Sequence, residues 1–102
     1  MKDKAQKLIE KYEELESELG NPDVLADQAR YNKIHKQYKG IEKAVQKAKE
    51  YLQLVNDLAE YKAALGDPDP EMVAMAKSEI SEIEKKLPGV TDELQILMVP
   101  KD

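Results

Sequence analysis

Basic side chains are concentrated between residues 30 and 49 of an otherwise acidic chain. This stretch holds seven basic residues and one acidic residue, Glu42, so its net charge is +6; the whole chain carries −5, which leaves −11 for the remainder. A stripe of this kind is suited to bind a phosphate backbone or an acidic partner. The alternative is a solvated helix face that only balances the acidic helices beside it. The candidate partner-binding residues, called the basic stripe below, are Arg30, Lys33, Lys36, Lys39, Lys43 and Lys47.

Few other side chains have a type and spacing suited to catalysis or metal binding. The chain contains no cysteine and a single histidine, His35, which removes thiolate zinc sites and most histidine-based acid–base schemes. The di-iron bundle motif requires a Glu three residues before its histidine, whereas position 32 is Asn. The glutamates between Glu13 and Glu18 point around the outer surface of a predicted helix. We therefore expect no catalytic residue, no metal site and no cofactor.

The composition favours helices over strands. Charged residues make up 36% of the chain and aromatic residues 5%, and the strong helix formers Ala, Leu, Glu, Lys and Gln dominate. No stretch approaches the roughly 20 apolar residues that a membrane span needs, and the N-terminus lacks the apolar run of a secretory signal. We expect a soluble protein without membrane partners, and the absence of cysteine suits a cytoplasmic location.

Apolar residues spaced three and four apart predict three main helices. Their expected ranges are about 3–19, 27–65 and 70–98. Turn signals separate these ranges, and a short helical turn is expected at Pro22 with Asn21 as its cap. Asp27 and Asp69 are the expected caps of the second and third main helices, and Pro70 suits a first helical position.

The central helix is the longest and has two apolar stripes in its second half. Its main seam runs from Tyr31 to Ala59. From Tyr51 onward a second stripe appears, made of Leu54, Leu58, Tyr61 and Leu65. Two adjacent stripes are typical of a wide buried face. We therefore expect the second half of this helix to contact two neighbours or to carry an interface.

Pro88-Gly89 interrupts the third helix without changing its apolar phase. The spacing of three and four continues from Leu87 to Val90, which a true loop would have no reason to preserve. We interpret 88–90 as a kink in one helix; the alternative is a break into two helices, with Thr91 as the cap of the second. Residues 99–102 are expected to begin an interdomain linker.

Short connections between long amphipathic helices require antiparallel neighbours. The predicted fold is all-α: an elongated antiparallel bundle of three main helices with coiled-coil-like packing. Residues 1–102 are expected to form a single helical domain.

Several short motifs, in order along the chain, resemble those of a known family. They are Lys11-Tyr12-Glu13-Glu14-Leu15, Asn21-Pro22-Asp23-Val24, Asp27-Gln28-Ala29-Arg30-Tyr31, Asp69-Pro70-Glu71-Met72 and Leu97-Met98-Val99-Pro100-Lys101-Asp102. Across essentially its whole length the chain resembles the N-terminal domain of bacterial class I peptide chain release factors. The fit is to the type that reads UAA and UAG. Pro88-Gly89 departs from the family, which usually has an uninterrupted polar helix there.

The resemblance implies a role in translation termination. In that family the codon-reading motif and the Gly-Gly-Gln motif lie further along the polypeptide, and neither is present here. The resemblance therefore implies a non-catalytic fragment that is not an enzyme and that works with the remaining domains of its full-length chain. It also implies docking at the ribosomal stalk base, on protein and rRNA, and support of the class II, GTP-hydrolysing release factor. The basic stripe is the candidate contact.

A second hypothesis belongs to a different class of protein. A free-standing coiled-coil scaffold or chaperone-like interaction protein would use the second apolar stripe to form a homodimer. Sedimentation at several concentrations separates the two hypotheses, because a dimer depends on concentration.

Overall fold

The computed structural model describes residues 1–100, which form four helices and no strand. The helices are α1 (Lys2–Leu19), α2 (Pro22–Leu25), α3 (Gln28–Ala64) and α4 (Pro70–Leu97). The predicted all-α, elongated bundle is confirmed, with α3 the longest helix and overall extents of 61 × 28 × 16 Å. Residues 101–102 of the expected linker lie outside the described residues. Among the helices of residues 1–100, none combines the length and apolar composition that a membrane span requires.

The three predicted N-terminal caps are confirmed. The side chain of Asn21 accepts a hydrogen bond from the Asp23 N–H at 2.9 Å and starts α2. Asp27 accepts from the Arg30 N–H at 3.1 Å at the start of α3. Asp69 accepts from a backbone N–H in the first turn of α4 at 3.0 Å. Each cap satisfies a backbone donor that has no partner inside its helix, so the helix starts are fixed by local sequence.

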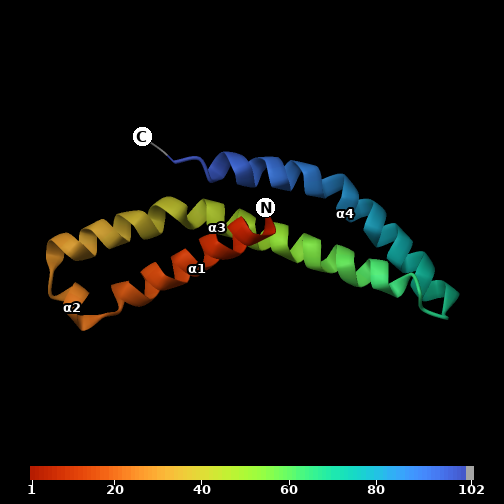
Figure 1. Ribbon diagram of the computed structural model, residues 1–102, viewed down its shortest axis with the longest axis horizontal. Coiled ribbons are helices and arrows are strands. Elements are labelled where there is room, and N and C mark those ends of the chain that lie inside the picture. Colours follow the sequence, from red (N-terminus) through yellow and green to blue (C-terminus); the bar gives the residue numbers. More distant parts are fainter. Residues whose placement is uncertain (101–102) are drawn as a thin grey trace.

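The long helix α3 is shared by two antiparallel helix pairs (Figure 1). Helix α1 packs along the first half of α3, α4 packs along the second half, and α2 closes the turn between α1 and α3. Where the second half of α3 begins, Tyr51 and Leu52 pack on the cluster that contains Ala5 of α1 and Leu94 of α4. The predicted contact with two helical neighbours is therefore found at the start of that half, and α4 continues along α3 toward the turn that joins them. The stripes there are half-buried at best, with Leu65 40% exposed.

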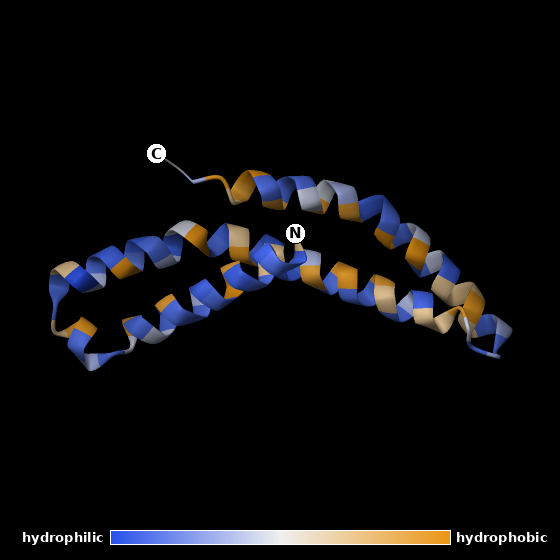
Figure 2. Cartoon of the chain, viewed as in Figure 1, coloured by the Kyte–Doolittle hydropathy of each residue, from blue (hydrophilic) through white to orange (hydrophobic). Residues whose placement is uncertain are grey.

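Two clusters of buried residues hold these pairs together. At one end Leu15, Val24 and Ile34 join α1, α2 and α3. In the middle of the molecule Ala5, Ala48 and Leu94 join α1, α3 and α4, each with no exposed surface. Alanines at this crossing let three helices approach closely, because they add little volume between the backbones. Figure 2 shows hydrophobic residues on the facing sides of the helices and hydrophilic residues outside.

Helix α4 is continuous through Pro88. The Thr91 hydroxyl donates a hydrogen bond to the Leu87 carbonyl at 2.8 Å, one turn earlier in the same helix. Thr91 is therefore an interior residue of α4, and the alternative in which it caps a second helix is wrong. Figure 1 shows α4 as a curved rod that bends over α3, as expected for a helix that contains a proline.

Candidate functional site

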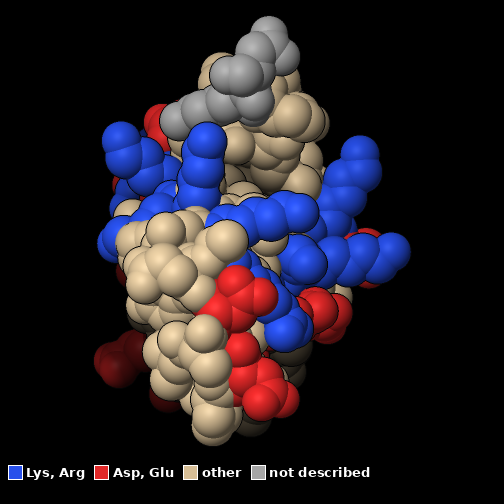
Figure 3. Space-filling view, turned by 90° about the vertical axis from the view of Figure 1, so that its left-hand side faces the viewer, with Lys and Arg blue, Asp and Glu red and all other residues tan. Residues whose placement is uncertain are grey.

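The basic stripe lies on the first half of α3, on the same half-helix that packs against α1. Five of its six residues are exposed, and the sixth, Lys47, is half-buried. Figure 3 views the molecule from the end where α2 lies. Lys and Arg side chains gather in the upper part of this view and project to both sides, with Asp and Glu side chains mostly below them. The sequence-predicted residues share one half of α3, and at about 100° per residue they cover the half of its circumference that faces away from α1.

Lys47 differs from the rest of the stripe because it links two helices. Its Nζ lies 2.8 Å from Glu93 Oε2 in α4 and 2.9 Å from Glu50 Oε2 in α3. Hydrogen bonds to Glu93 first, and then to Glu50, raise the pKa of Lys47. Only 23% of the Lys47 side chain is exposed. Its charge is therefore engaged within the fold and is not free for a partner.

The remaining members of the stripe are more available. Lys39 pairs with Glu42 at 3.0 Å one helical turn away, but both side chains are accessible to solvent and such pairs are weak. Within residues 1–100, four members form no ion pair: Arg30, Lys33, Lys36 and Lys43. These four side chains can contact an external anion without breaking an internal interaction.

A groove between α1 and α3 adjoins the stripe and was not predicted from the sequence. Its floor is apolar, with Leu8 and Leu15 from α1 and Ile41 and Ala44 from α3. Lys11 of α1 and Lys36 of α3 also line the groove, residues 97–100 add a third segment to its lining, and its volume is about 680 Å³. Gly40, a glycine inside α3, also lines the groove. That glycine is the one signal in the sequence that indicates an open helix surface here.

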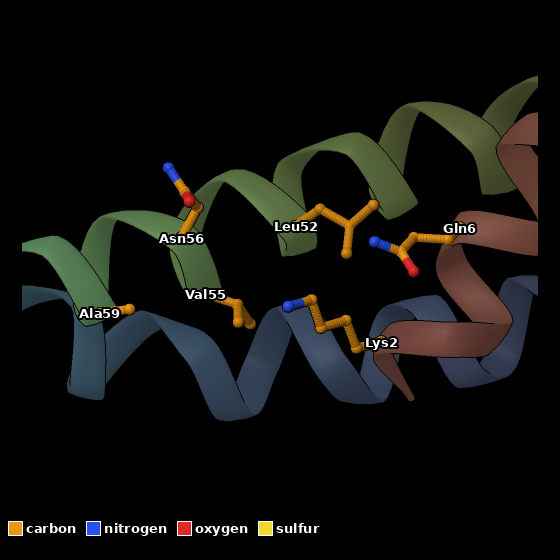
Figure 4. A pocket seen from close by; sticks show the side chains of 6 residues that line it. All are labelled: Lys2, Gln6, Leu52, Val55, Asn56 and Ala59. Atoms are coloured by element: carbon orange, nitrogen blue, oxygen red, sulfur yellow. The ribbon is translucent and has the colours of Figure 1, made fainter.

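A second, smaller groove lies where α1 begins (Figure 4). The side chains of Lys2 and Gln6 reach toward the apolar residues Leu52 and Val55 of α3. Its volume is about 300 Å³. Because flexible polar side chains of α1 already cover its apolar wall, this groove presents little free surface.

Polar aromatic residues at the stripe are used in packing. The rings of Tyr12 and Tyr38 stack with centroids 4.3 Å apart, which joins α1 to α3. A hydrogen bond with the Tyr38 side chain, together with partial burial, raises the pKa of Tyr12 to about 12. His35 is exposed, and its ring lies 6.0 Å from that of Tyr31. Within residues 1–100 no cluster of three or more His, Cys, Asp or Glu residues is placed to hold a metal ion.

Comparison with known proteins places the chain in a family. A family model described as the PCRF domain matches residues 8–102. The chain belongs to the PCRF domain family. The resemblance to bacterial class I release factors that the sequence motifs indicated is therefore confirmed.

Three relatives named peptide chain release factor 1 are similar to the chain over nearly its whole length. A peptide chain release factor 1 from Oleidesulfovibrio alaskensis is 42% identical over 99 residues, and one from Acidobacterium capsulatum is 34% identical over 102 residues. A third, from Flavobacterium psychrophilum, is 36% identical over 103 residues. These alignments cover 97% to 100% of this chain but 28% to 29% of each relative. No solved structure matches the chain.

Proposed function

We propose that this chain acts in translation termination as a non-catalytic, N-terminal helical domain of a peptide chain release factor. The observation that carries the proposal is the 42% identity to a peptide chain release factor 1 over 97% of the chain. In this proposal the catalytic step belongs to the other domains of a full-length factor, and the helical domain contributes binding. A cytoplasmic location and a functional link to the class II release factor are parts of the same proposal.

The proposed docking partner is the base of the ribosomal stalk, both its protein and its rRNA. The support is electrostatic: Arg30, Lys33, Lys36 and Lys43 are exposed cations that form no ion pair within residues 1–100. Exposed cations on a rigid helix gain affinity for phosphate by releasing counterions. The chain as a whole is acidic, so binding is confined to this segment rather than spread over the surface.

A binding assay with matched charge reversals tests the docking surface. The triple variant Lys33→Glu, Lys36→Glu, Lys43→Glu removes three free cations of the stripe and leaves Lys47 in its contact with α4. The control reverses three exposed lysines elsewhere that also form no ion pair within residues 1–100, Lys62, Lys77 and Lys86. Both variants change the net charge equally.

The expected result is a selective decrease in affinity for a stalk-base RNA fragment bound to its protein. The stripe variant should bind at least about tenfold more weakly than the control. The slope of log K against log salt concentration should become shallower by roughly 0.7–0.9 for each phosphate that the variant no longer neutralises. Equal binding by both variants would remove the stripe from the proposal, and no binding by the wild type would remove the docking itself.

A homodimeric scaffold is the second candidate function. The observation that favours it is a group of partly exposed apolar residues near the turn between α3 and α4: Leu65, Met72 and Met75, exposed by 40%, 39% and 42%. Sedimentation velocity at rising concentration decides between the two. A monomer at every concentration would leave the docking domain as the sole candidate, whereas a concentration-dependent dimer would support the scaffold.

A further inference from the structure

We propose that the groove between α1 and α3 binds a helix of a partner protein that carries an apolar stripe flanked by acidic residues. The proposal goes beyond ribosome docking through the basic stripe, because it names a surface that shares Lys36 with the stripe but adds Lys11 and the apolar residues between α1 and α3. It does not require that the chain bind RNA.

The shape of the groove suits a helix. The apolar floor lies between α1 and α3, where Leu8 and Ile41 are partly exposed above the buried Leu15 and Ala44. The exposed side chains of Leu97 and Val99 add apolar surface to the same groove. At Gly40 a Cβ atom would meet nothing within 4 Å, so α3 has a bare strip of backbone facing the groove. Bare backbone of this kind allows another helix to approach closely, and an apolar groove between helices is a common receptor for an amphipathic helix.

The charge of the groove selects for acidic flanks on the occupant. Lys11 stands on the α1 side and Lys36 on the α3 side. Among residues 1–100, no Asp or Glu lines the groove. A helix with glutamates beside its apolar stripe matches both walls, whereas a basic helix would be repelled. A nucleic acid would satisfy the lysines but would leave the apolar floor exposed.

The molecule itself shows how such a helix sits on α3. Along one face of α3, at spacings of three and four, lie Lys36, Gly40, Lys43, Lys47, Tyr51, Leu54 and Leu58. Helix α4 covers the apolar end of this face: Tyr51 packs on the cluster that contains Leu94, and Leu58 lines a small pocket together with Leu87 of α4. Glu93 of α4 pairs with Lys47 at 2.8 Å. Helix α4 ends at Leu97, and the groove begins there. Residues 98–100 already line the groove next to the end of α4, so an acidic amphipathic helix would lie beside them, toward the lysine end of this face. It would pair with Lys36 and Lys43 as Glu93 pairs with Lys47.

Fluorescence anisotropy with a designed peptide tests the proposal. The probe is a labelled synthetic helix about 18 residues long, which is enough for an isolated helix to form, with leucines on one stripe and glutamates beside it. Two comparison peptides replace either the glutamates by glutamine or the leucines by serine. The receptor is the full 102-residue chain. We expect saturable binding of the probe and at least about tenfold weaker binding of each comparison peptide.

Two glycine variants supply the matched control on the receptor. Gly40→Glu places a carboxylate inside the groove, and Gly89→Glu makes the same change on α4 outside it. At both positions an added Cβ meets nothing within 4 Å, so both variants should fold, which circular dichroism will check. We expect Gly40→Glu to weaken binding of the probe at least about tenfold and Gly89→Glu to leave it within about twofold.

Three results would overturn the proposal. The first is no saturable binding of the probe to the wild-type chain. The second is equal binding of the probe and the peptide without leucines, which would show adsorption to the lysines alone. The third is self-association of the chain that Gly40→Glu abolishes, which would make a second copy the occupant. None of these results depends on whether the chain binds the ribosomal stalk base, so the two proposals can fail separately.

Discussion

At the scale of single residues, the basic stripe contains two kinds of cation. Lys47 is held between Glu50 and Glu93 and joins α3 to α4, whereas Lys33, Lys36 and Lys43 are exposed and form no ion pair within residues 1–100. Residue type and spacing do not distinguish Lys47 from the other lysines. The difference becomes visible only in the structure, where Glu93 of α4 lies beside Lys47. The free cations are the ones expected to bind, and Lys47 the one expected to stabilise.

A double-mutant cycle on Lys47 and Glu93 tests the structural role of this pair. Changing Lys47→Met and Glu93→Gln, singly and together, should show a coupling between them in thermal unfolding, because the pair crosses two helices and is partly shielded from solvent. The same cycle on the exposed pair Lys39 and Glu42 should show little coupling. Equal coupling in both cycles would contradict a special role for Lys47.

Tyr12 should ionise later than an ordinary tyrosine. A hydrogen bond with Tyr38 raises the pKa of Tyr12 from 10.0 to about 12. Because the folded state favours the neutral phenol, this contribution to stability is complete below pH 10 and is lost between pH 10 and 12. Ultraviolet titration of the native chain should show a late component that Tyr12→Phe removes. A single transition of all five tyrosines near pH 10 would show that the interaction is absent.

At the scale of helices, features that depend on neighbouring residues in the sequence were predictable. Features that depend on contacts between distant segments were not. Asn21, Asp27 and Asp69 cap their helices through donors two or three residues away, so the sequence alone predicts them. The sequence also indicated the second apolar stripe of α3. The number of helices that pack on it depends on where α1 begins and on the path of α4, which the sequence does not show. The groove beside Lys36 was missed because its floor comes from two helices far apart in sequence.

The crossing of α1, α3 and α4 should depend on small side chains. Ala48 has no exposed surface and lies beside Ala5 and Leu94. Ala48→Leu should destabilise the fold by roughly 1–3 kcal/mol because the larger side chain forces the helices apart. Ala63→Leu, at an exposed position of α3, should change stability by less than about 0.5 kcal/mol. Chemical denaturation measures both, and a tolerated leucine at position 48 would mean that the crossing is loosely packed.

Gly40 weakens α3 and should be replaceable by alanine. A Cβ at this position meets open space, and alanine is the better helix former. Gly40→Ala should therefore raise the free energy of unfolding by roughly 0.5–1 kcal/mol. Gly89→Ala, in α4, makes the same exchange in equally open space and should have a similar effect. If Gly40→Ala lowered the free energy of unfolding instead, a neighbouring group would have to lie closer to Gly40 than the structure places it.

At the scale of the whole molecule, one long helix divides the chain into two regions of different character. The first half of α3 carries the basic stripe and packs on α1, and the second half packs on α4. The stretch from 30 to 49 is strongly positive and the rest of the chain is negative. Long-range attraction therefore orients an anionic surface toward the first half of α3. Recognition is expected at that half of the molecule and not at the turn between α3 and α4.

Chemical-shift mapping locates the docking surface most directly. The ¹⁵N-labelled chain would be titrated with a stalk-base RNA fragment and its protein, and amide shifts followed along all the helices. We expect shifts concentrated between Arg30 and Lys43, with little change in α4 before Leu87. Shifts concentrated around the turn between α3 and α4, or no shifts at saturating partner, would contradict it.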